Sequence, residues 1–97
     1  MQNITSNETI NPYWTSHAML RKQQRGIKSN EVDIVFFNGD REMPAGSNCY
    51  HLTISKNRLK LLVTEETICP KIAEKCKNLV VLTNGQSIIT TFRKSWL

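Results

Sequence analysis

The dipeptide Asn84-Gly85, set between two short apolar segments, is the feature that most constrains the fold of this chain. The flanking segments, Leu79–Thr83 and Ser87–Phe92, are rich in β-branched residues, which favour strands. Asn-Gly is a strong signal for a two-residue hairpin turn, because both residues tolerate positive φ. The sequence therefore predicts a β-hairpin near the end of the chain. By alternation we expect one face of its last strand to hold Ile88, Thr90 and Phe92, and the other Ile89, Thr91 and Arg93.

The first half of the sequence predicts two consecutive helices. The first has Thr15 or Ser16 as its N-cap and runs without Gly or Pro until Gly26 ends it. The second begins at Ser29 or Asn30 and stops at Asn38-Gly39. Its apolar positions Val32, Val35 and Phe36 follow the helical spacing i, i+3, i+4.

The middle of the chain has mixed signals. Residues 41–46 include Pro44 and Gly46 and are predicted to be a loop, whereas residues 49–54 have strand composition. Residues 56–63 fit either a second hairpin strand or a helix capped at Ser55, and we favour the helix. Pro70 is predicted to start another helix that runs to about residue 77. The predicted class is α+β, with an N-terminal helix pair packed on a small antiparallel sheet of about three to four strands that ends in a β-hairpin.

The length of 97 residues suffices for one domain and excludes a multidomain enzyme. We expect a flexible polar leader over residues 1–12 and a single domain over residues 13–97. The leader lacks a basic-then-apolar signal pattern, and no apolar stretch approaches the length of a membrane span. These features predict a cytoplasmic protein without a membrane partner.

The net charge of +5 is unevenly placed along the chain. Residues 1–48 hold five basic and five acidic side chains, and residues 49–97 hold eight basic and three acidic ones, so the whole excess lies in the second half. The first half nevertheless contains a cluster without any acid between residues 17 and 28, formed by His17, Arg21, Lys22, Arg25 and Lys28. Such a cluster is compatible with a polyanionic partner such as RNA, and also with an ordinary solvated helix face.

Three cysteines, Cys49, Cys69 and Cys76, are an odd number that argues against a disulfide framework. Together with His51 they match no common spacing for structural zinc, so we expect reduced thiols, no metal and no cofactor.

His17, Arg21 and Arg25 recur every four residues on the first predicted helix, so their side chains lie only about 40° apart around its axis. Like charges at this spacing repel, and something should compensate for them. One solution is a set of ion pairs with Glu31, Asp33, Asp40 or Glu42. The other is a phosphate backbone, gripped by the guanidinium groups. In that case a histidine that its cationic neighbours keep neutral could act as general base in RNA cleavage.

The end of the chain adds further candidates. If the first helix crosses the hairpin, Thr90 and Arg93 could join His17, Arg21 and Arg25 in one catalytic site, although threonine is also simply a good strand former. Lys22, Lys28 and Lys94 are candidates for RNA contact. Trp14, Tyr50 and Trp96 offer rings that could stack on bases or, as is more common, pack in the core.

These residues also carry a family resemblance. The segment Ser16-His17-Ala18-x-x-Arg21-x-x-x-Arg25-Gly26-Ile27 and the later Ile88-Ile89-Thr90-x-Phe92-Arg93 resemble a small bacterial family of uncharacterised function with the pattern H-A-x-x-R-x-x-x-R-G-I. That family looks related to the barnase, EndoU, colicin and RelE-like nuclease fold, whose members are mostly metal-independent ribonucleases and often toxins. The resemblance implies His17, Arg21, Arg25, Thr90 and Arg93 as site residues. Phe92 stands where a tyrosine is common in the family.

The leading expectation is therefore a metal-independent ribonuclease-like protein, a candidate toxin of a toxin–antitoxin or bacterial conflict system. Its expected partners are RNA and an antitoxin or immunity protein. The alternative is a non-catalytic module of the same fold that binds RNA or protein. A purely structural domain, with every arginine paired to an acid, is the third reading.

Overall fold

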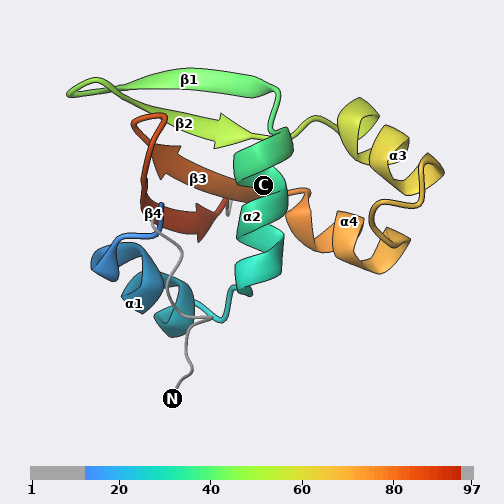
Figure 1. The fold of residues 1–97 in the computed structure, drawn as a ribbon, viewed down its shortest axis with the longest axis horizontal. Helices are drawn as coiled ribbons and strands as arrows, with labels where there is room; N and C mark the ends of the chain where they lie inside the picture. Colours follow the sequence, from blue (N-terminus) through green and yellow to red (C-terminus); the bar gives the residue numbers. More distant parts are fainter. Residues whose placement is uncertain (1–12, 95–97) are drawn as a thin grey trace, which may run out of the picture.

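The computed structural model describes residues 13–94 and has an α+β fold, which confirms the predicted class (Figure 1). The predicted leader, residues 1–12, lies outside the described residues. In chain order the elements are α1 (Ser16–Gln24), α2 (Ser29–Asn38), β1 (Arg41–Gly46), β2 (Cys49–Thr53), α3 (Lys56–Thr64), α4 (Pro70–Cys76), β3 (Leu79–Thr83) and β4 (Ile88–Arg93). The strands form one sheet in the order β1-β2-β3-β4, and each neighbouring pair is antiparallel.

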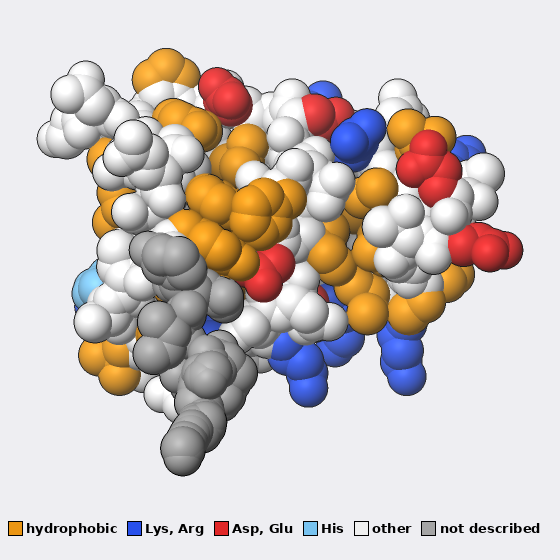
Figure 2. Space-filling model, in the orientation of Figure 1, with side chains coloured by type: hydrophobic (Ala, Val, Ile, Leu, Met, Phe, Trp, Pro, Cys, Tyr) orange, Lys and Arg blue, Asp and Glu red, His pale blue; other side chains and the backbone are white. Residues whose placement is uncertain are grey.

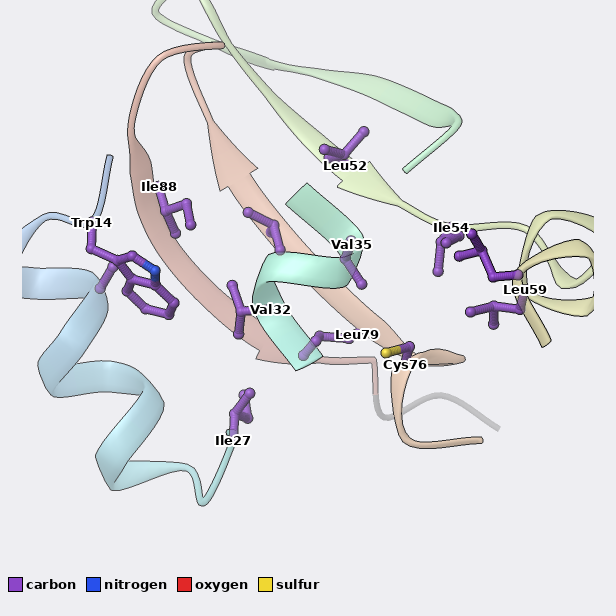
Figure 3. Close-up of a cluster of buried hydrophobic side chains, with 13 residues drawn as sticks. Trp14, Ile27, Val32, Val35, Leu52, Ile54, Leu59, Cys76, Leu79 and Ile88 are labelled. Atoms are coloured by element: carbon purple, nitrogen blue, oxygen red, sulfur yellow. The ribbon is translucent and has the colours of Figure 1, made fainter. Parts of the chain in front are cut away.

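The helices occupy three positions around this sheet (Figure 1). Helix α2 crosses one face and contacts β2 and β3, α1 lies along β4 at the sheet edge, and the α3–α4 hairpin stands beside α2. The core lies between α2 and the sheet (Figure 3). Its fully buried members include Val32 and Val35 of α2 and Leu79, Val81 and Ile88 of the sheet.

Helix α1 is tied to β4 through its N-cap. Thr15 Oγ1 accepts a hydrogen bond from the Ala18 amide at 3.1 Å and donates to the Ile88 carbonyl at 2.8 Å. The helix ends before Gly26, which adopts a φ of 66°. A helix whose only fully buried residue is Ala18 is thereby fixed along the edge strand.

Helix α3 settles the ambiguous segment after β2 in favour of the expected helix. Ser55 Oγ accepts from the Arg58 amide at 3.1 Å, which makes Ser55 the N-cap. Leu59 and Leu62 are buried while Leu61 is exposed, as the helical period requires and a strand period does not. The helix predicted from Pro70 is also present as α4, with Pro70 in its first turn.

The predicted loop over residues 41–46 is wrong, because this segment forms the edge strand β1. It pairs with β2 from Arg41 to Gly46, and all six of its side chains are exposed. The prediction of a loop rested on Pro44 and Gly46. Proline lacks the N–H that a central strand needs, but it is tolerated at a sheet edge, where one side of the strand has no partner strand.

The hairpin of β3 and β4 is confirmed, but its turn and its faces differ from the prediction. The connection runs over residues 84–87, where Asn84 Oδ1 accepts from the amides of Gln86 and Ser87. The register shifts so that Thr83 opposes Ile88 while Leu82 opposes Thr90. Ile89 is the extra residue of a bulge, and a bulge reverses the alternation on one side of it. Ile88 therefore shares the helix-covered face with Thr91 and Arg93, not with Thr90 and Phe92.

On the side of the molecule that α2 covers, hydrophobic side chains gather at the centre of the surface (Figure 2). Tyr13 stacks on Phe36 with ring centroids 5.2 Å apart, and Phe37 packs edge-on against both. Phe37 remains 62% exposed. Within residues 13–94, no helix is long and apolar enough to cross a membrane.

Candidate functional site

The basic face of α1 brings two of the predicted site residues together. Arg21 Nε donates to His17 Nε2 at 3.4 Å, and Arg21 Nη1 donates to Gln24 Oε1 at 3.3 Å. His17 is exposed, and its ring nitrogen accepts this weak hydrogen bond. The pair thus presents a guanidinium and an imidazole side by side at the surface.

The ion pairs considered for Arg21 and Arg25 do not form in the part of the chain that the structure describes. Three of the four acids interact elsewhere: Glu31 pairs with Arg93, Asp33 accepts from the Trp14 indole at 3.2 Å, and Asp40 accepts from Ser55. The positive charge of α1 is therefore not neutralised by acidic side chains of residues 13–94.

Arg25 points to the sheet and not to a shared cleft with His17. Its Nη1 donates to the Thr91 carbonyl at 2.8 Å, on the outer edge of β4. This contact holds the end of α1 against the strand, as Thr15 holds its beginning.

Arg93 lies on the helix-covered face and is bound there at two nitrogens. Nη2 forms an ion pair with Glu31 Oε1 at 2.9 Å, and Nη1 donates to the Lys75 carbonyl at 2.6 Å. The Glu31 side chain is only 5% exposed and that of Arg93 35%. Arg93 thus joins β4 to α2 and α4, and its recorded contacts do not place it with His17.

Thr90 lies on the opposite sheet face from Arg93, as strict alternation along this part of β4 predicts. Its Oγ1 is buried and has no hydrogen-bond partner within residues 13–94. Thr91, by contrast, is fully buried and donates to the Val80 carbonyl at 2.9 Å, so it serves the hairpin.

The predicted RNA-contact lysines are dispersed. Lys22 is half-buried on α1 and Lys28 is exposed just before α2. The amide of Lys94 donates to the Asn78 carbonyl. Of the rings considered for stacking, Trp14 is buried in the core, Tyr50 is half-buried, and Trp96 lies outside the described residues.

The sheet face that α2 does not cover contains a groove that the sequence did not predict. Its volume is about 290 Å³, and its lining comes from the four strands and Lys94, with no helix residue among those described. The members that face it include Arg41, Met43, His51, Phe92 and Lys94. His51 and Phe92 meet edge-to-face with ring centroids 5.7 Å apart.

Part of this groove could have been found from the sequence. Alternation along residues 49–54 places His51 and Thr53 opposite the apolar Leu52 and Ile54, which would have exposed the histidine on the open face. Arg41 and Met43 could not be found in this way, because residues 41–46 were predicted to be a loop.

The cysteines are distributed over separate environments. Cys49 is half-buried, Cys69 exposed and Cys76 fully buried, and residues 13–94 contain no cluster of three or more His, Cys, Asp or Glu side chains suited to a metal ion. Burial, together with the nearby charge of Glu31, raises the pKa of the Cys76 thiol to about 11. Cys76 therefore remains a neutral core thiol, donating to the Glu31 carbonyl at 3.7 Å.

Fold and site together define a small α+β protein with a basic helix along one sheet edge and, on its open face, a groove lined by two rings and by charged side chains, with Glu42 beside Arg41 and Lys94. Comparison of the chain with protein-family models, curated proteins and solved structures finds no match.

Proposed function

We propose that this protein binds single-stranded RNA across α1 and the open face of the sheet. The observation that supports the proposal is the adjacency of two surfaces: the basic face of α1, without acidic partners, runs along β4, and β4 also contributes Phe92 to the groove. Arg25 connects them, because it binds the carbonyl of Thr91, the residue before Phe92.

The α1 surface suits a phosphate backbone. Arg21 donates to His17 and Gln24 and not to a carboxylate, so its positive charge remains available to a ligand. A guanidinium can offer two parallel N–H donors to a phosphate, which gives geometry as well as attraction. A bound phosphate would also relieve the repulsion between Arg21 and Arg25, which are four residues apart on the helix.

The groove suits an unstacked base. Single-stranded RNA is commonly recognised by stacking of splayed bases on aromatic rings, with arginine and lysine beside the backbone. Phe92 and His51 supply the rings, and Arg41 and Lys94 line the same groove. An open antiparallel sheet gives such a base access from solvent.

The test is fluorescence anisotropy with a labelled 15-nucleotide RNA of mixed sequence, at 100 mM salt with EDTA. We expect Arg21→Gln and Arg41→Gln each to weaken binding about three- to tenfold, and Phe92→Leu by about fivefold or more, as loss of one stacked base predicts. Lys71→Gln is the matched control, because Lys71 is exposed on α4 and lines neither surface. Absence of binding by the folded protein at 100 µM, or an equal effect of Lys71→Gln, contradicts the proposal.

Ribonuclease activity is the second candidate, favoured by the His17–Arg21 pair and by the resemblance to ribonuclease toxins. In this reaction a base removes the proton of an RNA 2′-hydroxyl, whose oxygen attacks the adjacent phosphorus and expels the 5′-oxygen of the next nucleotide, which must be protonated. His17 Nε2 could take the first proton once Arg21 turns to the phosphate. Incubation with mixed RNA in EDTA tests this candidate: it expects cleavage that His17→Ala abolishes. Intact RNA at micromolar protein would rule it out while leaving RNA binding standing.

A further inference from the structure

A second groove lies between α3 and α4, away from the sheet. Its volume is about 460 Å³, and its apolar lining is entirely aliphatic: Leu59 and Val63 from α3, Pro70 and Ala73 from α4. The two helices contact each other, and only α4 packs substantially on α2, so the hairpin stands at one side of the molecule (Figure 1). Hydrophobic side chains are visible over this hairpin at the surface (Figure 2).

The rim of this groove is positively charged. Lys56 and Lys60 lie one turn apart on α3, a helix without any acidic residue, and both are exposed. Neither forms an ion pair within residues 13–94. On the α4 side Lys77 pairs with Glu74 at 2.9 Å, so the α4 rim is neutral and the α3 rim is cationic.

We propose that this groove binds an acidic amphipathic helix of a partner protein. Apolar side chains at i, i+3 and i+4 of that helix would enter the aliphatic groove, and Asp or Glu residues on one flank would face Lys56 and Lys60. Helix-in-groove recognition uses this combination of apolar anchors and complementary charge. The inference is independent of RNA binding, since it rests on a different surface.

The chemistry of the lining favours a protein over RNA at this position. The groove has no aromatic ring on which a base could stack and no arginine to grip a phosphate with two donors. Both are present in the groove of the open sheet face. The two grooves thus differ in the class of ligand that each suits.

The experiment uses the full chain, labelled with ¹⁵N, and a synthetic 16-residue peptide with Leu at helical i, i+3, i+4, i+7 spacing and Glu on one flank. We expect amide shifts confined to α3, α4 and their connection, and binding weakened about tenfold by Lys56→Glu combined with Lys60→Glu. The matched control combines Lys71→Glu and Lys75→Glu, two exposed lysines of α4 at the same spacing that do not line the groove. This control should change the affinity less than twofold.

Three outcomes overturn the assignment: no shifts at 1 mM peptide, equal binding of a peptide with the same composition and no apolar periodicity, or shifts centred on α1 or the open sheet face. Displacement of the peptide by the 15-nucleotide RNA through direct contact with α3 would assign the groove to RNA instead. A concentration-dependent dimer that Lys56→Glu with Lys60→Glu disrupts would assign it to a second copy of the chain. The variant with Lys56→Glu and Lys60→Glu should bind the 15-nucleotide RNA with the affinity of the native chain. Loss of peptide binding without loss of RNA binding distinguishes this proposal from the proposed function.

Discussion

At the scale of single residues, the side chain of Arg93 shows how burial decides what a cation does. A terminal arginine on a strand was expected near phosphate, but Glu31 lies within 2.9 Å and is almost wholly buried. A carboxylate that is ionised inside a protein requires a partner, because an unpaired buried charge costs several kcal/mol. Because the buried Glu31 carboxylate requires a cationic partner, Arg93 is held beside it. The position of Arg93 in the sequence gives no sign of this partner.

The Glu31–Arg93 pair should therefore stabilise the fold in a measurable way. We expect Glu31→Gln to lower the free energy of unfolding by about 1–3 kcal/mol, less than for a fully buried pair because Arg93 is partly exposed. Urea unfolding of the two single variants and of the double variant Glu31→Gln/Arg93→Gln gives the coupling energy. Additive losses, with coupling below about 0.3 kcal/mol, would show that the contact contributes nothing as a pair.

At the scale of elements, helix α3 depends on a short relay between Asp40 and its N-cap. Asp40 accepts from the Ser55 amide at 2.8 Å and from Ser55 Oγ at 2.7 Å, and Ser55 Oγ in turn accepts from the Arg58 amide. The hydrogen bond from the Ser55 hydroxyl is the main cause that holds the pKa of Asp40 below its ordinary value of 3.8. The relay thus anchors the start of α3 to the segment before β1.

A lowered pKa in the folded state means that the unfolded chain binds protons more readily, so stability falls as the pH drops through the pKa of the folded state. We expect Asp40→Asn to cost about 0.5–1 kcal/mol at pH 7, a small value because the carboxylate is exposed to solvent. The difference from the native chain should shrink as the pH falls below 3.8 and through the lower pKa of Asp40 in the folded state. Thermal unfolding at pH 7 and pH 2.5 measures it; an equal difference at both pH values would contradict the relay.

The turn between α2 and β1 offers a second test at this scale. A Cβ on Gly39 would lie 2.6 Å from the Val35 carbonyl oxygen and 2.7 Å from Leu52 Cγ, so backbone and core side chain would both have to move. We expect Gly39→Ala to cost about 2–4 kcal/mol, and Gly26→Ala about 1 kcal/mol, because Gly26 has positive φ but open space around it. Chemical unfolding of both variants compares them. If Gly39→Ala lowers the free energy of unfolding no more than Gly26→Ala does, the backbone at Gly39 does not lie as close to Val35 and Leu52 as these distances require.

Elements were predictable where local chemistry determined them. Caps at Thr15 and Ser55, and the proline at the start of α4, located helices because their partners lie within a few residues. The strand β1 and the bulge at Ile89 were missed because the register of pairing with the neighbouring strand of each hairpin determines them, and the composition of the segment alone does not give that register. The bulge places Ile88 on the same sheet face as Arg93 and opposite Thr90, so which residues of β4 face the helices could not be predicted without the register.

At the scale of the whole molecule, the distribution of charge matters more than its sum. The net charge of +5 comes from the second half of the sequence, yet α1 in the first half also presents cations that form no ion pair within residues 13–94. The helical spacing of His17 and Arg21 was enough to predict that they lie together. This is the part of the candidate site that can be predicted from local geometry. The groove required four strands from two hairpins that lie far apart in the sequence.

The salt dependence of RNA binding distinguishes a local surface from the total charge. For single strands the logarithm of affinity falls with the logarithm of salt concentration by about 0.7 per phosphate contact. If Arg21, Lys22 and Arg41 make the main contacts, the slope should be about −2, and Arg21→Gln should reduce its magnitude by about 0.7. Lys71→Gln removes the same charge from α4 and should leave the slope unchanged. Anisotropy titrations from 50 to 300 mM salt measure both; equal reductions in the two variants would mean that the molecule attracts RNA through its net charge and not through α1 and the sheet.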